Sequence, residues 1–290
     1  MSDVIFNKSI PGLSAEEIRP EKNFSMANRH LHDNIEILYM LEGERYFFIE
    51  QNIYYVKKGM AVMINHNQLH RGSIVDDSTQ YHRFVLYVDT AMLNKYFSLP
   101  HIPAVQNFGE KYWGVAEFTQ EDWQQSLNTL ETMKKEMNRN TSEGNALSLL
   151  LVMQLMTLFA RNRKNFDSSF PQELMPNKKN IPATHQLVHE IALYLQNHSH
   201  ETCLLDDVAS RFYISRSYLT RIFKSVTGFT VSEYLMTCRV QNAKVLLDKT
   251  DLDITEISIR TGFGSASYFN KIFKRIADMT PLQYRKREKA

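Results

Sequence analysis

The hydrophobic pattern of the chain changes near residue 120. Between residues 35 and 89, short segments rich in β-branched and aromatic residues are separated by Gly, Asn or Asp. They read IEILYML, RYFFIE, IYYVKK, MAVMI and HRFVLYVD, and this pattern predicts β-strands. The stretch EQNIYY predicts a hairpin with Gln51 and Asn52 at its turn. The first part of the chain is therefore expected to be a β-domain.

From Glu121 the apolar residues follow a helical spacing instead. The segments EDWQQSLNTLETMKKEMNRN and GNALSLLLVMQLMTLFARNR both have helical composition. The second segment is strongly apolar, so either its own sheet or a second subunit must cover it. Its apolar row is formed by Leu147, Leu150, Leu151, Leu155 and Leu158, with Gln154 among them. A polar, proline-containing stretch then predicts a linker at 166–182 between domains 1–165 and 183–290.

The C-terminal part contains the same pattern twice. SYLTRIFKSVTGFTVSEY begins at Ser217, and SYFNKIFKRIADMTPLQY begins at Ser267. In each copy four apolar residues recur at i, i+3, i+4 and i+7, which predicts one buried helix face. These residues are Leu219, Ile222, Phe223 and Val226 in the first copy and Phe269, Ile272, Phe273 and Ile276 in the second. The opposite faces are polar and basic: Ser217, Thr220, Arg221 and Lys224, then Ser267, Asn270, Lys271 and Lys274.

Local signals place a short helix and a tight turn before each of these helices. Ser215 is a suitable N-cap for a helix over 216–226, and the second helix is expected over about 265–276. Capping boxes are predicted at Thr230 with Glu233 and at Thr280 with Gln283. Two helices joined by a tight turn, the second polar and basic, describe a helix-turn-helix unit. One such unit could be core helices with a solvated face, but two units favour DNA binding in neighbouring major grooves, about 34 Å apart.

Charge and composition agree with two soluble domains. The 290 residues carry a net charge of +2, with 15 Lys and Arg against 11 Asp and Glu from His185 onward. Cys203 and Cys238 lie among apolar residues and outside any CxxC pair, which predicts free thiols in a reducing cytosol. No run approaches the roughly 18 apolar residues of a membrane span, and the N-terminus lacks a secretion-signal pattern. A cytoplasmic location without membrane contact follows.

Specific motifs connect the C-terminal part to a known family. SYLTRIFK, YLMTCRVQNAKVLL, DITEISIRTGF, SYFNKIFK and MTPLQYRK follow one another along this part of the chain. The segment that contains them, from about His185 to Lys289, resembles the DNA-binding domain of AraC/XylS-family transcription regulators. Two positions depart from the family pattern: Ser258 replaces the usual alanine and Asp278 the usual glycine. The resemblance implies a double helix-turn-helix domain that binds double-stranded DNA.

The resemblance also implies which side chains contact DNA. The family's base-reading positions correspond to Ser217, Thr220, Arg221, Ser267, Asn270 and Lys271. An arginine such as Arg221 can contact guanine in a bidentate manner, although a phosphate contact is the alternative, and Asn270 can pair with adenine. Backbone contacts are expected from the neighbouring Arg216, Lys224 and Lys274, and Ser265 is a further candidate DNA contact.

The front part has its own candidate chemistry. On a continuous strand His30, His32 and Glu36 point the same way, and His70 follows later. Three His and a carboxylate can hold a transition metal, and the spacing resembles the two cupin motifs, with Gly43 and Gly59 at their expected places. N-terminal domains of many AraC-like regulators resemble cupins and bind a small effector rather than a metal. The resemblance therefore favours an effector pocket, and Tyr39, Arg45 and Tyr46 are further candidate pocket residues.

The predicted architecture is α+β: a cupin-like β-barrel followed by helices, then an all-α double helix-turn-helix domain. We predict a transcription activator without catalytic activity or cofactor, controlled by a small molecule, a carbohydrate, bound in the barrel. The resemblance implies RNA polymerase as a partner and a homodimer formed through helices at 121–161. The alternative is a cupin-type metalloenzyme with a helical C-terminal appendage, which would require bound metal and substrate turnover.

Overall fold

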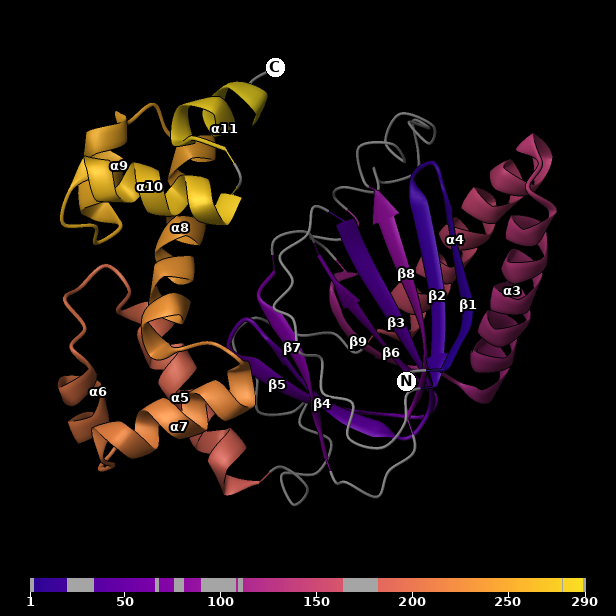
Figure 1. Ribbon diagram of the computed structural model, residues 1–290, viewed down its shortest axis with the longest axis horizontal. Coiled ribbons are helices and arrows are strands. Elements are labelled where there is room, and N and C mark those ends of the chain that lie inside the picture. Colours follow the sequence, from indigo (N-terminus) through magenta and orange to yellow (C-terminus); the bar gives the residue numbers. More distant parts are fainter. Residues whose placement is uncertain are drawn as a thin grey trace. The chain divides into compact units, whose positions relative to one another are not determined.

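The chain forms two compact units of different architecture. The computed structural model describes residues 3–19, 34–65, 68–75, 81–89, 108, 112–163, 182–277 and 279–288. One unit comprises residues 1–49 and 54–180, and the other comprises residues 181–290 with the turn at 50–53. The first is rich in β-strands and the second is helical (Figure 1). The predicted α+β fold class is confirmed.

The strands of the first unit belong to two antiparallel sheets. The larger has the order β1-β2-β8-β3-β6-β9 and the smaller the order β5-β4-β7. Their bounds are β1 Asp3–Ile10, β2 Leu13–Arg19, β3 Asn34–Glu42, β4 Glu44–Ile49, β5 Asn52–Lys57, β6 Met60–Ile64, β7 His70–Ile74, β8 His82–Asp89 and β9 Gly114–Glu117. All five predicted strands are present. The predicted hairpin is also present, but its turn is Glu50–Gln51 rather than Gln51–Asn52, because Glu50 takes the left-handed conformation (φ 57°).

Strand β3 separates two apolar layers, because its side chains alternate between the two faces of the larger sheet. Ile35, Ile37 and Tyr39 pack with residues of α3 (Gln120–Arg139) and α4 (Ser142–Asn162), which cover one face of this sheet (Figure 1). Leu38 and Met40 pack with residues of the smaller sheet. The even-numbered positions of β3, Glu36 among them, therefore face the space between the two sheets.

Helix α4 is apolar mainly because it packs against the larger sheet. By length and composition it could cross a membrane. However, Val152, Leu155 and Phe159 are fully buried in the layer between sheet and helices. Leu147 and Leu150, on its outer side, are 39% and 56% exposed. Packing on the sheet explains most of its composition, and two exposed leucines remain.

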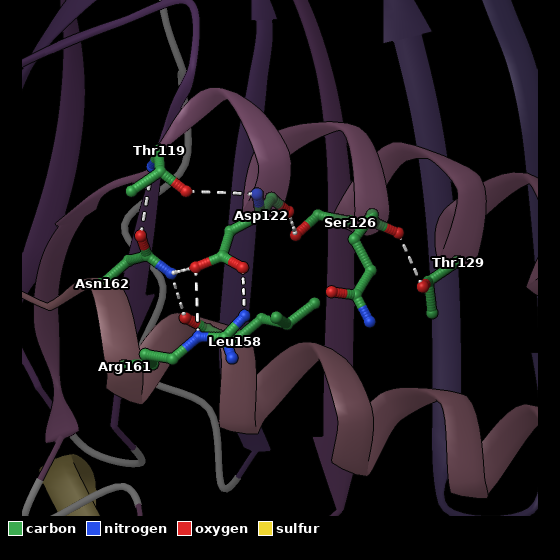
Figure 2. A network of polar contacts seen from close by, with 8 residues as sticks. Thr119, Asp122, Ser126, Thr129, Leu158, Arg161 and Asn162 are labelled. Atoms are coloured by element: carbon green, nitrogen blue, oxygen red, sulfur yellow. Dashed lines mark hydrogen bonds and ion pairs between the residues drawn. The ribbon is translucent and has the colours of Figure 1, made fainter.

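A polar network ties the start of α3 to the end of α4 (Figure 2). The Asp122 carboxylate accepts hydrogen bonds from the Asn162 amide (2.6 Å) and from Arg161, whose Nε lies 3.1 Å away. Asn162 in turn accepts a hydrogen bond from the Thr119 backbone (3.1 Å), and the Thr119 side chain caps α3. The Asn162 amide, with Arg161 adding to its effect, holds the pKa of Asp122 below its usual value. The network fixes the two helices at the point where α4 ends.

We expect Asp122→Asn to destabilise this helix pair by about 1–2 kcal/mol at pH 7, because it removes hydrogen bonds to a charged group. A lowered carboxyl pKa contributes stability above about pH 4, and this contribution is lost as the pH falls through the folded-state value. The free energies of urea unfolding of variant and wild type should therefore converge as the pH falls through this lowered pKa. Glu121→Gln removes the same charge from the same turn, and an equal loss in that variant would contradict the prediction.

The second unit is built around one long helix. The bounds are α5 Ala183–Asn197, α6 Leu205–Arg211, α7 Arg216–Thr227, α8 Val231–Lys249, α9 Ile254–Arg260, α10 Ala266–Ala277 and α11 Pro281–Glu288. Helices α5–α7 lie at one end of α8, and α9–α11 lie at the other (Figure 1). Phe269, Phe273 and Ile257 join Val240 and Leu247 of α8 in the core of the second group. Each group is one helix-turn-helix unit, and α8 connects them.

The predicted caps of these helices are confirmed. The Ser215 side chain accepts a hydrogen bond from the Tyr218 backbone at the start of α7. Thr230 and Glu233 form the first capping box, and Thr280 and Gln283 form the second. The departure at Ser258 is accommodated, because its buried hydroxyl donates to the Thr255 carbonyl (2.8 Å). Asp278 lies outside the described residues.

Tyr213, in the turn between α6 and α7, has a left-handed backbone conformation (φ 54°). Its side chain is 97% exposed, so no packing compensates for the strain. This conformation costs about 1–2 kcal/mol for a residue other than glycine. Glycine loses about 0.5–1 kcal/mol more conformational entropy on folding, so Tyr213→Gly should stabilise the unit by up to about 1 kcal/mol. Urea unfolding would measure this gain. Tyr213→Ala retains the strained Cβ, and an equal gain in that variant would assign the effect to the ring instead.

Candidate functional site

The outer faces of α7 and α10 form one candidate site. All ten side chains predicted to contact DNA are exposed and lie on these two helices or directly before them. They are Arg216, Ser217, Thr220, Arg221, Lys224, Ser265, Ser267, Asn270, Lys271 and Lys274. The apolar rows of the same helices are turned inward, with Leu219 and Phe223 of α7 and Phe269 and Phe273 of α10 fully buried. Each helix therefore has one face in the core and one polar, basic face in solvent.

Contacts within this surface distinguish its members. The Arg221 guanidinium lies over the Tyr218 ring, 5.1 Å from its centroid, which limits the conformations of this arginine. Arg216 forms an exposed ion pair with Asp206 (3.2 Å). Ser265 accepts a hydrogen bond from the Tyr268 backbone and caps α10, so its hydroxyl has a structural role. The contact with Tyr218 leaves the Arg221 side chain exposed on the outer face of α7.

Sequence reasoning missed three side chains on or beside this surface. Tyr218 supports Arg221, Tyr213 is exposed in the turn before α7, and Arg275 is exposed in the last turn of α10. Arg275 follows Lys274 directly, and its basic character was the available signal. The aromatic residues carried no such signal, because the same residue type fills buried positions elsewhere in both units.

The interior between the two sheets forms a second candidate site. Glu36 of β3 and His70 of β7 face each other, with Oε2 and Nε2 3.4 Å apart and the two side chains 0% and 2% exposed. His70 Nδ1 donates to the Gln68 carbonyl (2.9 Å), since a carbonyl oxygen only accepts. Nε2 is therefore the ring atom that faces the carboxylate. The structure brings together these two of the predicted pocket residues.

Two arginines extend this buried polar group. The Arg45 guanidinium lies 4.0 Å from the centroid of the Tyr81 ring, and Arg83 donates to the Tyr81 hydroxyl (3.3 Å). Burial raises the pKa of Tyr81 and of Tyr87, so both phenols keep their proton at neutral pH and can donate hydrogen bonds. Arg45 was predicted from the sequence, whereas Tyr81, Arg83 and Tyr87 were not. The alternation of Arg83, Val85 and Tyr87 along β8 was the missed signal.

The other predicted pocket residues do not join this group. Tyr39 lies on the opposite face of β3, where its hydroxyl donates to the Leu155 carbonyl (3.4 Å). Tyr46 alternates with Arg45 and Phe47 along β4 and contacts Tyr55 instead (5.7 Å between ring centroids). Both were selected for residue type, and the pleat of the strand turns them away. His30 and His32 lie outside the described residues.

The described ranges contain two of the four candidate metal ligands, Glu36 and His70, whereas His30 and His32 lie outside them. Glu36 and His70 are near each other, but within the part of the chain that the structure describes no group of three or more His, Cys, Asp or Glu side chains could hold a metal ion. The arrangement provides instead a carboxylate, an imidazole, two guanidinium groups and phenols around one interior. Such a set forms hydrogen bonds with a small polar molecule.

Comparison with known families gives two matches that together cover most of the chain. The AraC-like ligand binding domain matches residues 17–156. A helix-turn-helix domain matches residues 208–287. The first match contains the smaller sheet, the larger sheet apart from β1 and most of β2, α3 and most of α4. The second contains α7 and α10.

Similar proteins are named as HTH-type transcriptional regulators. An uncharacterized HTH-type transcriptional regulator of Bacillus subtilis (strain 168), YdeC, is 26% identical over 268 residues, or 89% of this chain and 85% of that protein. One of Staphylococcus aureus (strain COL) is 24% identical over 90% of this chain, which spans only 32% of that protein. The solved C-terminal domain of AraT, a response regulator from Geobacillus stearothermophilus, is 31% identical with a TM-score of 0.35, covering 36% of this chain and 88% of that domain.

Proposed function

Because the chain belongs to the AraC family of DNA-binding transcriptional regulators with a ligand-binding domain, we propose that α7 and α10 bind two successive DNA elements under the control of a small molecule. The observation that carries this proposal is the pair of exposed polar faces on two helices joined by α8. Recognition helices of this kind enter the major groove and contact base edges. The ten side chains named above are the proposed contacts.

The experiment that tests double binding is selection of sequences from a random DNA pool with the full-length protein. The expected result is enrichment of a site with two elements about 10 base pairs apart, one helical turn of DNA. The enrichment should weaken as salt rises, because phosphate contacts release counterions. Enrichment of a single element would contradict double binding. No enrichment, with or without candidate effectors, would contradict the proposed function itself.

The proposed effector is a carbohydrate bound between the two sheets. Support comes from the buried group of Glu36, His70, Tyr81, Arg83 and Arg45, which offers both donors and acceptors to the hydroxyl groups of a sugar. An effector changes the balance between two arrangements of the protein only as far as its affinity for them differs. Binding would shift the chain toward the arrangement that occupies DNA, and activation through RNA polymerase would follow in the cytoplasm.

A homodimer is the proposed assembly. Leu147 and Leu150 on the outer side of α4 are exposed, and no packing within the described part of the chain covers them. A second copy could cover these leucines, in line with the predicted pairing through helices at 121–161. Two copies would then present four recognition helices to one stretch of DNA.

A further inference from the structure

The two helix-turn-helix units contact each other beside the middle of α8. The loop between α5 and α6, residues 198–204, belongs to the first helix-turn-helix unit (Figure 1). The turn between α9 and α10, residues 261–265, belongs to the second helix-turn-helix unit. Gly262 in this turn approaches the loop so closely that an added Cβ would lie 2.7 Å from the His200 carbonyl oxygen. We call these two segments and Arg239 of α8 the junction.

Arg239 holds the junction together. Its Nε donates to the Ser199 carbonyl (2.7 Å), and a terminal nitrogen donates to the Glu201 carbonyl (2.8 Å). Its guanidinium lies 5.9 Å from the centroid of the Phe263 ring in the other unit. Arg239 is only 8% exposed and Ser199 1%, so these contacts are shielded from water. One side chain of α8 therefore contacts both units.

A second contact fixes the same loop. Asn242, three residues after Arg239 on α8, donates to the Ser199 hydroxyl (3.0 Å). The turn on the other side is equally constrained, because Thr261 is 2% and Phe263 4% exposed. Gly262 has a positive φ of 83° and faces backbone atoms that cannot rotate away. The turn leads directly into α10, so its position sets the direction of the second recognition helix.

A small rotation at the junction would move one recognition helix relative to the other by a distance comparable to the rise per base pair. A helix of 19 residues such as α8 is about 28 Å long, close to the 34 Å of one DNA turn. A rotation of about 10° at its middle would move a group about 15 Å away by about 2.6 Å, most of the 3.4 Å rise per base pair. Contacts that prevent such rotation would therefore determine which spacing of two elements the protein accepts.

We propose that Arg239 is a positioning residue: with Gly262 it fixes α7 and α10 relative to each other and makes the protein select the spacing of its two DNA elements. This inference rests on the proposed binding of two elements. Arg239 need not touch DNA, since it acts through the loop and the turn that it holds. Lysine would not replace it, because an ammonium group cannot make the two fixed hydrogen bonds of a guanidinium.

The test measures binding of the full-length protein to duplexes with the two selected elements at optimal spacing, with one or two base pairs added or removed, and with one element only. Wild type should prefer the optimal spacing by about tenfold or more. Arg239→Leu should lose about tenfold at the optimal spacing and bind all spacings within about twofold. Its affinity for one element should be unchanged, which shows that each unit remains folded.

Matched variants separate positioning from other effects. Lys249→Leu removes the same charge from α8, and Gly264→Ala adds a Cβ in open space two residues from Gly262; both should keep the wild-type spacing preference. Gly262→Ala and Arg239→Lys should both reduce it, and the latter is the milder test if Arg239→Leu does not fold. A wild-type spacing preference in these junction variants would overturn the proposal. A wild type without any spacing preference would contradict binding of two elements as well.

Discussion

Arg221→Ala should lower the affinity for the selected two-element site by about 10- to 100-fold and leave the affinity for random DNA within about twofold. A bidentate contact between arginine and guanine provides about 1–3 kcal/mol of discrimination, and 1.4 kcal/mol corresponds to a factor of ten. Arg221 is exposed on the outer face of α7, and its contact with Tyr218 restricts its conformations before DNA arrives. Binding would be measured by competition between the selected site and random duplex.

Two variants of α7 serve as controls for this result. Lys224→Ala removes a cation from the same outer face, and we expect equal losses on both kinds of DNA because lysine there would contact phosphate. Arg221→Lys keeps the charge and loses the planar pair of donors, so it should retain random binding and lose site preference. If Arg221→Ala weakens both kinds of DNA equally, Arg221 contacts phosphate rather than a base.

The recognition helices could be predicted in detail because three independent signals agree on each. Apolar spacing gives the buried row, and the polar residues between give the outer face. Ser215 gives the start of α7, and the two capping boxes mark where the next helices, α8 and α11, begin. Each signal depends on residues within about one turn of a helix, so it is complete in the local sequence. The repetition of all three within one chain strengthens the prediction further.

The barrel interior was less predictable, because its members come together only through sheet topology. Glu36 lies on β3 and His70 on β7, in different sheets, and Arg83 joins them from β8. Strands β1, β2, β7 and β9 were not predicted, since their sequences contain charged or small residues at several positions. Tyr39 shows the same limit: its residue type suits a pocket, but strand register places it against α4.

The turns illustrate a limit of a different kind. Tyr213 and Gly262 occupy corresponding places in the two helix-turn-helix units, and both have positive φ. Only Gly262 lies against another segment, the His200 backbone, while the Tyr213 side chain extends into solvent. The reason for glycine at position 262 could not be predicted from the sequence, because the segment that it contacts lies about sixty residues earlier in the chain.

Phe273→Ala should destabilise the second helix-turn-helix unit by about 3–5 kcal/mol, the largest change in stability expected for these helices. Phe273 is fully buried, and its ring lies 5.5 Å from Phe269 and 5.7 Å from Tyr284 between ring centroids. Because a domain is stable by about 5–15 kcal/mol in total, this loss should expose the amides of α9–α11 to hydrogen exchange. Binding of the second DNA element should be lost with them.

The neighbouring residue provides the matched control. Lys274 is exposed on the same helix, so Lys274→Ala should change the free energy of unfolding by less than about 0.5 kcal/mol. It should nevertheless weaken binding to all DNA, since a phosphate contact is lost. The two variants thus separate the two faces of α10: one determines whether the helix is present, and the other what it binds. Equal losses of stability in both variants would show that the assignment of faces is wrong.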